Sequence, residues 1–340
     1  MIAAFCTAPK QFELRDVPVP TPASAEVIVR VHRCGICGSD LHFYHGTLPP
    51  PAVCPGHEIS GEVADVGTGV SDMKAGDRVV VEPLIVCGTC VFCRTGDYQI
   101  CPRFQVAGNS VDGGFAEYMR MPAYALFRLP PEVDYEVGAL AEPLAVTVHA
   151  ARLAPVRMGD RVLVLGAGTI GLLALASAKA AGAGDIWITA RHRQQATAAT
   201  ALGATRVFTG AASQGELQAA AHEQPIDVVI ETVGGTADTL NDAVHFVRRG
   251  GTVVVLGIFG SSPPLSALIL VVKEVRLVGS MTYGRSGTRA DFDIALDLLA
   301  RSPETFRQLV THRFRLSELA KAFEIASDKR SGAIKVAIEP

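Results

Sequence analysis

Residues 1 to about 145 carry short runs in which hydrophobic and polar residues alternate, and Gly and Pro interrupt these runs. Examples are AEVIVRVHRC, GEVADVG and DRVVVEP. Alternation with a period of two is typical of half-buried β-strands, and Gly and Pro favour turns between them. The pattern therefore predicts a β-rich domain with many turns.

From about residue 148 to 275 apolar runs alternate with Ala-rich helical stretches. The apolar runs are RVLVLG, DIWIT, DVVIET and GTVVVLG, and the helical stretches are LLALASAKAAG, QATAATALG and NDAVHFVRRGG. Strands that alternate with helices predict βαβ units and a parallel sheet. The remaining residues predict helices near 291–300 and 317–326 and a last strand, IKVAIEP, which we expect to return to the first domain.

Length and composition agree with two folded domains. The chain has 340 residues, of which 49% are hydrophobic and 19% charged, and this excludes an extended disordered protein. A formal charge of −3 gives no basic excess for nucleic acid or an anionic membrane. The first residues lack a signal-peptide pattern, and no apolar run reaches the roughly 18 residues of a membrane span. We expect a cytoplasmic protein that binds neither nucleic acid nor membranes.

Four of the eight cysteines fall within one loop, CGTCVFCRTGDYQIC, as Cys87, Cys90, Cys93 and Cys101. Four thiolates from a short loop can surround a Zn²⁺ ion tetrahedrally, and such clustering favours a metal site in a reducing compartment. An iron–sulfur cluster and paired disulfides are the alternatives. Because four protein ligands leave no open position, we predict a structural zinc site.

A second candidate metal site lies in HRCGICGSDLHFYHG and the PGHE that follows it. A catalytic zinc needs about three protein ligands and one open position. Cys37, His57 and a glutamate supply such a set. A single Cys or His in an apolar segment is more often part of a core, so the spacing alone leaves both interpretations open.

The segment RVLVLGAGTIGLLALASAKAAG predicts a dinucleotide site. Gly166, Gly168 and Gly171 stand between an apolar strand and a helix, where glycines let the backbone approach a pyrophosphate. An acidic residue about twenty positions further on would bind the ribose 2′-hydroxyl of NAD. That position holds Ala190, followed by Arg191, His192 and Arg193. We therefore predict NADP in preference to NAD; the alternative is that the two arginines are solvated residues at a helix start.

Several motifs together resemble the zinc-dependent medium-chain alcohol dehydrogenases over essentially the whole chain. They are CGICGSD, GHEISGEV, the loop with four cysteines, AEPLAVTVHA and GAGTIG, in this order. Glu142 stands where the alcohol dehydrogenase branch often has a cysteine, so the resemblance is to the polyol branch, which includes sorbitol and threonine dehydrogenases. It implies an α/β fold with a GroES-like β-rich catalytic domain (1–147 and 278–340), a doubly wound Rossmann domain (148–277) and an active site in the cleft between them.

The resemblance also implies roles for individual residues. Cys37 and His57 are similar to the catalytic zinc ligands, with Glu58 or Glu142 as the third. Asp40 is similar to the carboxylate that orients a ligand imidazole, and Ser39 and His42 match the positions of a proton relay. The implied cofactor contacts are Gly166, Gly168, Ile170, Gly171, Arg191, His192, Arg193, Leu256, Gly257, Ile258, Met281, Thr282 and Tyr283.

These positions imply an oxidoreductase with two Zn²⁺ ions, one catalytic and one structural, that transfers a hydride between NADP(H) and a secondary alcohol or ketone. Sorbitol itself is disfavoured, because Thr282 and Phe43 stand where sorbitol dehydrogenases have an arginine and often a tyrosine. The alternatives are an enzyme for a sugar, cyclitol or amino-alcohol and, more remotely, a non-catalytic nicotinamide-binding protein.

Oligomers are usual in the family, so we expect a homodimer or homotetramer that acts on a small-molecule substrate. The stretch SALILVV near Leu268 is either a subunit contact or a buried core element.

Overall fold

The structure is a computed structural model, and it describes residues 1–210 and 213–340. It divides the chain into two compact units, Met1–Glu142 with Gly284–Pro340, and Pro143–Tyr283. The second unit is therefore an insertion in the sequence of the first. The domain limits expected after residues 147 and 277 both fall inside the second unit. Near the first limit the helix α4 (Ala141–Leu153) is continuous through the boundary, so no loop marks it.

The first unit is built around a seven-stranded sheet with the order β18–β19–β3–β4–β5–β9, in which β8 also pairs with β3. In β3 (Glu26–Gly35) every second residue, Val27, Val29 and Val31, points into the apolar core, as a period of two requires. The other strands are β4 (Glu58–Val66), β5 (Arg78–Val81), β8 (Tyr118–Pro122), β9 (Leu126–Arg128), β18 (Val310–Arg315) and β19 (Lys335–Glu339).

Smaller elements surround this sheet. They are the strand pairs β1 (Ile2–Ala8) with β2 (Gln11–Asp16), β6 (Leu84–Ile85) with β7 (Gln105–Val106), and β16 (Arg285–Ser286) with β17 (Arg289–Ala290), and the helices α1 (Gly38–His45), α2 (Val91–Thr95), α3 (Tyr135–Gly138), α10 (Asp291–Arg301), α11 (Pro303–Arg307) and α12 (Leu319–Ser327). The Phe323 ring of α12 packs on Tyr44 of α1 and Phe12 of β2, with ring centroids 5.4 and 4.5 Å away. These ring contacts fix α1 on the apolar core.

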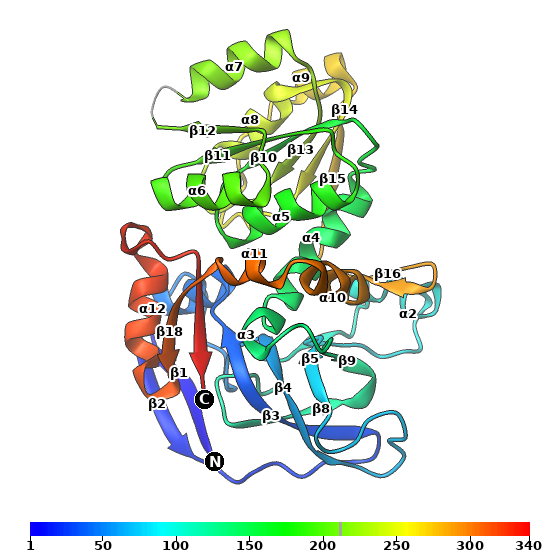
Figure 1. Cartoon of the computed structure of the whole chain (residues 1–340), viewed down its shortest axis with the longest axis vertical. Helices are drawn as coiled ribbons and strands as arrows, with labels where there is room; N and C mark the ends of the chain where they lie inside the picture. Colours follow the sequence, from blue (N-terminus) through cyan, green and yellow to red (C-terminus); the bar gives the residue numbers. More distant parts are fainter. Residues whose placement is uncertain (211–212) are drawn as a thin grey trace. The chain divides into compact units, whose positions relative to one another are not determined.

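The second unit contains a six-stranded parallel sheet with the order β12–β11–β10–β13–β14–β15. Helices α5 and α6 lie on one face, and α7, α8 and α9 lie on the other (Figure 1). The strand order reverses between β10 and β13, which is the point where doubly wound sheets bind ligands. The bounds are β10 (Arg161–Leu165), α5 (Thr169–Ala180), β11 (Asp185–Ala190), α6 (Arg193–Leu202), β12 (Arg206–Thr209), α7 (Ser213–Glu223), β13 (Ile226–Glu231), α8 (Thr239–Phe246), β14 (Val247–Val255), α9 (Ala267–Lys273) and β15 (Arg276–Gly279).

One expected helix is shorter than its sequence pattern. The stretch NDAVHFVRRGG predicts a helix through residue 251, but α8 ends at Phe246 and Val247 already belongs to β14. Gly250 has a φ of 68°, which a right-handed helix does not contain. A side chain on Gly251 would overlap the carbonyl oxygen of Asp227 at 2.8 Å, so the chain turns there to join the sheet.

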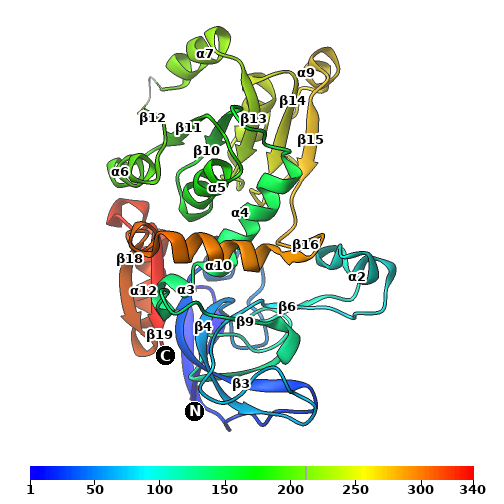
Figure 2. The same ribbon diagram turned by 45° about the vertical axis from the view of Figure 1, so that its right-hand side comes forward.

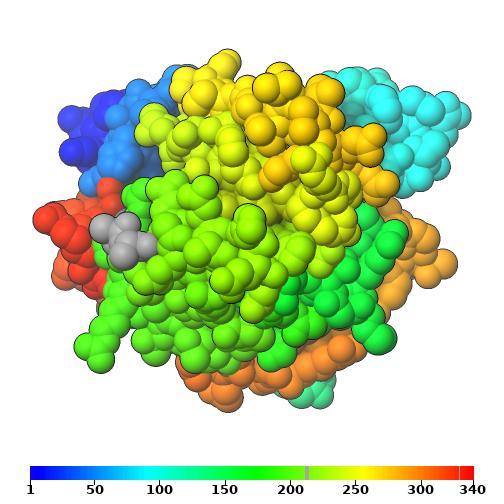
Figure 3. Space-filling model, turned by 90° about the horizontal axis from the view of Figure 1, so that it is seen from above, coloured from blue at the N-terminus to red at the C-terminus, as the bar shows by residue number. Residues whose placement is uncertain are grey.

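Helix α9 and strand β15 stand at the edge of the second unit, where β15 is the outermost strand (Figure 2). Leu268 and Val271 of α9 are 71% and 75% exposed. The segment near residue 270, coloured gold, lies on the surface that Figure 3 shows. Leu268 and Val271 are therefore not part of the core, whereas Ile269 and Leu270 of the same helix are partly buried and pack against it. None of the helices in the described ranges is long and apolar enough to cross a membrane.

Candidate metal centres and cofactor loops

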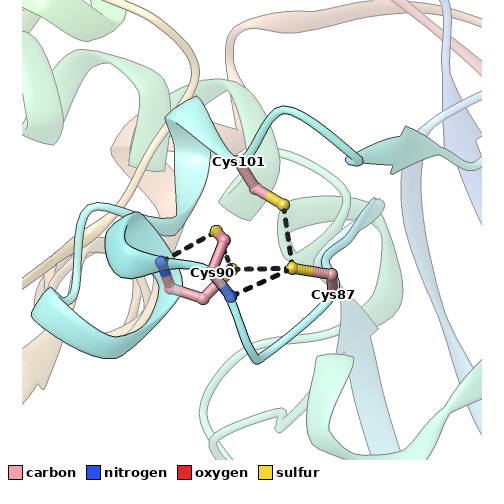
Figure 4. A group of neighbouring side chains, drawn as sticks. Cys87, Cys90 and Cys101 are labelled. Carbon is pink, nitrogen blue, oxygen red and sulfur yellow. Dashed lines mark hydrogen bonds between the residues drawn. The ribbon is translucent and has the colours of Figure 1, made fainter.

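The four cysteines of the loop 87–101 come together, and their sulfur atoms all lie within 4.8 Å of one another. The sulfur of Cys87 lies 3.8 Å from that of Cys93 and 3.5 Å from that of Cys101, and Cys90 lies 3.4 Å from Cys93 (Figure 4). A tetrahedral zinc with bonds of about 2.3 Å separates its sulfur ligands by about 3.8 Å. The loop therefore fits a zinc ion.

The local backbone explains how this short loop places four thiols together. Gly88 and Gly96 have φ values of 67° and 95°, which glycine adopts without strain. Backbone N–H groups of Thr89 and Cys90 lower the pKa of the Cys87 thiol to about 5, so the metal-binding thiolate is the stable form. All eight cysteines are free, which argues against the disulfide alternative.

The predicted catalytic ligand Cys37 caps the N-terminus of α1. Its N–H donates to the Asp40 carboxylate at 2.9 Å, and the other Asp40 oxygen lies 3.6 Å from Nδ1 of His57. The Cys37 sulfur also forms a hydrogen bond with the His57 ring. Asp40 is 1% exposed, so this buried carboxylate holds Cys37 by a hydrogen bond, while its second oxygen faces His57 without forming one.

Negative charge accumulates around these residues. Burial raises the pKa of Asp40 above its usual value and that of Glu142 to about 7. Burial alone lowers the pKa of His57, but the charges of Asp40 and Cys37 raise it well above the usual value. A thiolate, an imidazole and carboxylates are the ligands that zinc takes, and a divalent cation would balance this charge. The residues therefore fit a second zinc site.

Glu58 is engaged by a residue that the sequence did not single out. Both of its carboxylate oxygens lie 2.5 Å from Nζ of Lys335, which also donates to the Ile36 carbonyl at 2.9 Å. Lys335 and Glu58 side chains are 4% and 1% exposed. Burial opposes the ammonium charge of Lys335, but the Glu58 carboxylate raises its pKa above the usual value. The ion pair is therefore charged and buried.

The four expected catalytic ligands do not gather as the cysteine loop does, and the ion pair accounts for this only at Glu58. Among residues 1–210 and 213–340, the cysteine loop alone brings three or more potential ligand atoms within 4.8 Å of one another. Lys335 draws both oxygens of Glu58 to itself, whereas Glu142 is close enough to act on the charge of His57.

The predicted relay residues Ser39 and His42 are both partly buried on α1. Nδ1 of His42 lies 3.1 Å from the hydroxyl of Thr47, another residue that the sequence did not single out. Cys6, Cys34 and Cys54 are buried and belong neither to the four-cysteine loop nor to the site around Cys37.

In the second unit, the glycines of the predicted dinucleotide loop have the geometry that close backbone packing requires. Gly166 has a φ of 98°, and a Cβ on Gly171 would lie 1.9 Å from the Gly166 oxygen. Helix α5 begins at Thr169, directly after Gly168. A Cβ on Gly168 would meet nothing within 4 Å, so the space before the helix N-terminus is open, as an anion site requires.

The strand β11 ends at Ala190, and the side chains of Arg191 and Arg193 that follow it are exposed. The Gln195 side-chain oxygen accepts the N–H groups of Arg191 and His192, both at 3.2 Å. Gln195 thus caps the start of α6 and holds the backbone of Arg191 and His192 between the strand and the helix, which begins at Arg193.

The remaining predicted cofactor residues follow β14 and β15. Gly257 packs on Glu231, whose Oε1 accepts the N–H of Val233 at 2.8 Å and the Thr239 hydroxyl at 2.6 Å. Glu231 is fully buried and is a further residue that the sequence did not single out. Leu256 and Ile258 flank Gly257 after β14; Met281, Thr282 and Tyr283 follow β15, and Ile170 lies in α5.

Comparisons with known proteins agree with this architecture. Residues 23–131 match the family model of the alcohol dehydrogenase GroES-like domain, and residues 169–301 match that of the zinc-binding dehydrogenases. The chain is 33% identical to a sorbitol dehydrogenase of Bacillus subtilis, covering 100% of this chain and 97% of the relative.

Two solved structures are similar over almost their full length. One is a zinc-binding dehydrogenase from Sinorhizobium meliloti, described as putative and bound to NADP, with 31% identity, a TM-score of 0.89 and coverage of 100% of this chain and 99% of that one. The other is 2R,3R-butanediol dehydrogenase from Bacillus subtilis, with 32% identity, a TM-score of 0.86 and the same coverage.

A GroES-like domain with an inserted Rossmann domain and a four-cysteine loop defines a class of zinc-type oxidoreductases. The chain belongs to the zinc-dependent medium-chain alcohol dehydrogenase family, in its polyol branch. The family and fold predicted from the sequence are confirmed, and the activity is oxidoreduction of alcohols.

Proposed function

We propose that the protein is an NADP-dependent dehydrogenase that interconverts a secondary alcohol of the polyol type and a ketone. The observation that carries the cofactor choice is the end of β11, where Ala190 is followed by the exposed Arg191 and Arg193. NAD sites use a carboxylate at this place for the 2′-hydroxyl, and a carboxylate would repel a 2′-phosphate. Each charge-assisted hydrogen bond from an arginine contributes about 1.5–3 kcal/mol.

The site residues have distinct tasks in this proposal. Cys37, His57 and one of the two glutamates, Glu58 or Glu142, would hold the catalytic zinc. When bound, zinc lowers the pKa of a hydroxyl beside it, and the nicotinamide exchanges the hydride. Asp40 holds the His57 ring in position.

A proton must also leave the site when the alcohol is oxidised. The Ser39 hydroxyl and the His42 imidazole form the relay in our proposal, since imidazole exchanges protons near neutral pH.

The cofactor proposal is tested by steady-state rates with NADP and NAD on the full chain. We expect kcat/KM to be at least about tenfold higher with NADP, which corresponds to one charge-assisted hydrogen bond. The variant Ala190→Asp should reverse or abolish the preference, and Arg191→Ala should lower kcat/KM for NADP while leaving that for NAD unchanged. A wild-type preference for NAD would contradict the proposal.

The substrate class is tested by a panel of secondary alcohols, polyols, sugars, cyclitols and amino-alcohols, with the matching ketones in the reverse direction. Activity confined to primary alcohols, or none on any member, would overturn the secondary-alcohol assignment.

We further propose two zinc ions per chain. Metal analysis should give two for the wild type and one for Cys87→Ser, whose remaining three cysteines no longer close a site. Cys6→Ala, which alters a buried cysteine outside both sets, is the control and should keep two. One ion in the wild type would leave no catalytic zinc.

A further inference from the structure

The end of α1 brings Thr47 against His42. Gly46 follows the helix with a φ of 73° and turns the chain back on itself. As a result the N–H groups of Thr47 and Leu48 both donate to the carbonyl oxygen of His42, at 3.0 and 3.3 Å. The turn therefore holds Thr47, which is exposed, beside the His42 imidazole.

The Thr47 hydroxyl has two partners on the same residue. Its oxygen lies 3.1 Å from the His42 carbonyl oxygen and 3.1 Å from Nδ1 of the His42 ring. A hydroxyl carries one proton, and a carbonyl oxygen can only accept. If the proton points to the carbonyl, the hydroxyl oxygen turns a lone pair to Nδ1, which must then carry a hydrogen.

The opposite arrangement is less favourable. If the hydroxyl donated to Nδ1, the hydroxyl and carbonyl oxygens would face each other at 3.1 Å with no proton between them, and their partial negative charges would repel. The first arrangement places one proton in each of the two contacts of the hydroxyl. The geometry thus favours the Nδ1–H form of the neutral ring.

We infer that Thr47 is a positioning residue, which holds neutral His42 as the Nδ1–H tautomer and leaves the lone pair of Nε2 to accept the relay proton. This inference rests on the proposed function, in which His42 belongs to the relay. The two ring nitrogens are chemically distinct once one of them carries the hydrogen.

The proton balance of the step follows from this assignment. An N–H bond forms at Nε2 while the O–H bond of the relay hydroxyl breaks, that hydroxyl takes up the proton which the alcohol loses, and the ring gains one positive charge. The Nδ1–H donation to Thr47 is the same in the neutral and the charged ring. The proton is later released from Nε2 to water, so the ring takes up and loses the proton at one atom, and no hydrogen bond to Thr47 has to be remade.

The test compares Thr47→Val, which removes the hydroxyl at nearly constant shape, with Thr47→Ser, which keeps it. Nitrogen-15 NMR of histidine-labelled holoenzyme at alkaline pH reports the tautomer, and His42→Gln identifies the His42 signals. We expect the Nδ1–H form in the wild type and in Thr47→Ser, and a shift towards the Nε2–H form in Thr47→Val.

Activity gives a second readout. A complete general base contributes about 10²–10⁴-fold, so a partial loss of the correct tautomer should lower kcat about three- to tenfold in Thr47→Val, with KM unchanged and full recovery in Thr47→Ser. A wild-type Nε2–H tautomer, or an unchanged tautomer in Thr47→Val, would overturn the inference. An unchanged kcat in His42→Gln would instead contradict the proposed relay, so the two failures are distinguishable.

Discussion

Lys335 and Glu58 form a buried ion pair between two residues that lie 277 positions apart in the sequence. Replacing Lys335 by Met would leave the Glu58 carboxylate buried without its counter-charge. Removing one partner of such a pair costs about 3–5 kcal/mol. We expect Lys335→Met to lower the free energy of unfolding by this amount, measured by urea denaturation.

A second variant separates the charge from the packing. In Lys335→Met with Glu58→Gln neither position of the pair carries a charge, so most of the lost stability should return. Lys321→Met is the control, because Lys321 and Glu318 are exposed and 4.0 Å apart, and its effect should stay within about 1 kcal/mol. Wild-type stability of Lys335→Met alone would contradict the role of the pair.

The role of a single residue was predictable where its partners lie close to it in the sequence. The four cysteines of the loop stand within fifteen residues, so their spacing alone predicted that they meet. Lys335 carries no such signal, because only the pairing of β19 with β3 brings it to Glu58. Thr47 was missed for a different reason: it lies close in sequence, but its role depends on the turn at Gly46.

The turn from β10 into α5 allows a comparison of two glycines, Gly168 directly before the helix and Gly171 in its first turn. A Cβ at Gly171 would lie 1.9 Å from the Gly166 oxygen, whereas a Cβ at Gly168 would meet nothing within 4 Å. Gly171→Ala should therefore lower both the melting temperature and cofactor affinity. Gly168→Ala should keep the melting temperature and weaken cofactor binding alone, because its methyl group enters the space proposed for the pyrophosphate.

Thermal unfolding and cofactor titration by fluorescence measure these two effects separately. Equal melting temperatures for the two variants would show that the close packing of Gly171 on Gly166 does not constrain this loop.

Glu82, directly after β5, links this strand to the loop that carries the cysteines. It is 5% exposed, and Tyr98 of that loop forms a hydrogen bond with its carboxyl group. Burial raises the pKa of Glu82 from 4.5 to about 8, against the opposing effects of Tyr98 and Arg285, and the charges of Asp291 and Glu142 add to the increase. Glu82 is therefore largely protonated at neutral pH.

This pKa has a defined consequence for stability. The folded state keeps a proton that the unfolded state loses above pH 4.5, so this group makes stability fall as pH rises from about 4.5 to about 8. Glu82→Gln removes that dependence. The variant should gain a few kcal/mol relative to wild type between pH 5 and pH 8, measured by urea unfolding at both values. Parallel pH dependences for the two proteins would refute the assignment.

The order of strands and helices in the second unit was predictable because short apolar runs alternate there with Ala-rich helical stretches. The end of α8 was not, because the pattern of NDAVHFVRRGG continues past Phe246 and only the sheet pairing of Val247 with Ile226 shows where the strand starts. Tertiary hydrogen bonds here override a local helical pattern.

At the scale of the whole molecule, we propose that the exposed apolar side chains of α9, next to the edge strand β15, form the subunit contact of the oligomer expected from the sequence. The change Leu268→Glu places a charge where 71% of the side chain is exposed, so it should cost the single chain little. We expect it to reduce the molecular mass in solution from that of a dimer or tetramer, as measured by light scattering after size-exclusion chromatography.

Met158→Glu is the matched control, because Met158 is an apolar residue that is 94% exposed and far in sequence from α9. It should leave the mass unchanged. A wild-type monomer, or an unchanged mass in Leu268→Glu, would rule out this contact.

The organisation into two units was predictable because each unit has a motif whose residues lie close together in sequence. The first unit has the four-cysteine loop, and the second has the glycine-rich loop. Whether the SALILVV stretch is buried was not, because an apolar helix has the same sequence pattern in a core and in a subunit contact. The exposure of the Leu268 and Val271 side chains in the structure shows that this part of the stretch lies on the surface of the chain.

The position of β19 also sets an order for biosynthesis. Residues 143–283 leave the ribosome before residues 335–339, although β19 lies between β18 and β3 inside the sheet of the first unit. Domains generally fold as units during synthesis, so the inserted unit can fold first. Until β19 arrives, the end of β3 at Cys34 and Gly35 has an unpaired edge, and Glu58 lacks its counter-charge. The nascent chain thus keeps an open strand edge, of the kind that promotes aggregation, close in sequence to the proposed zinc ligand Cys37 until its last strand is made.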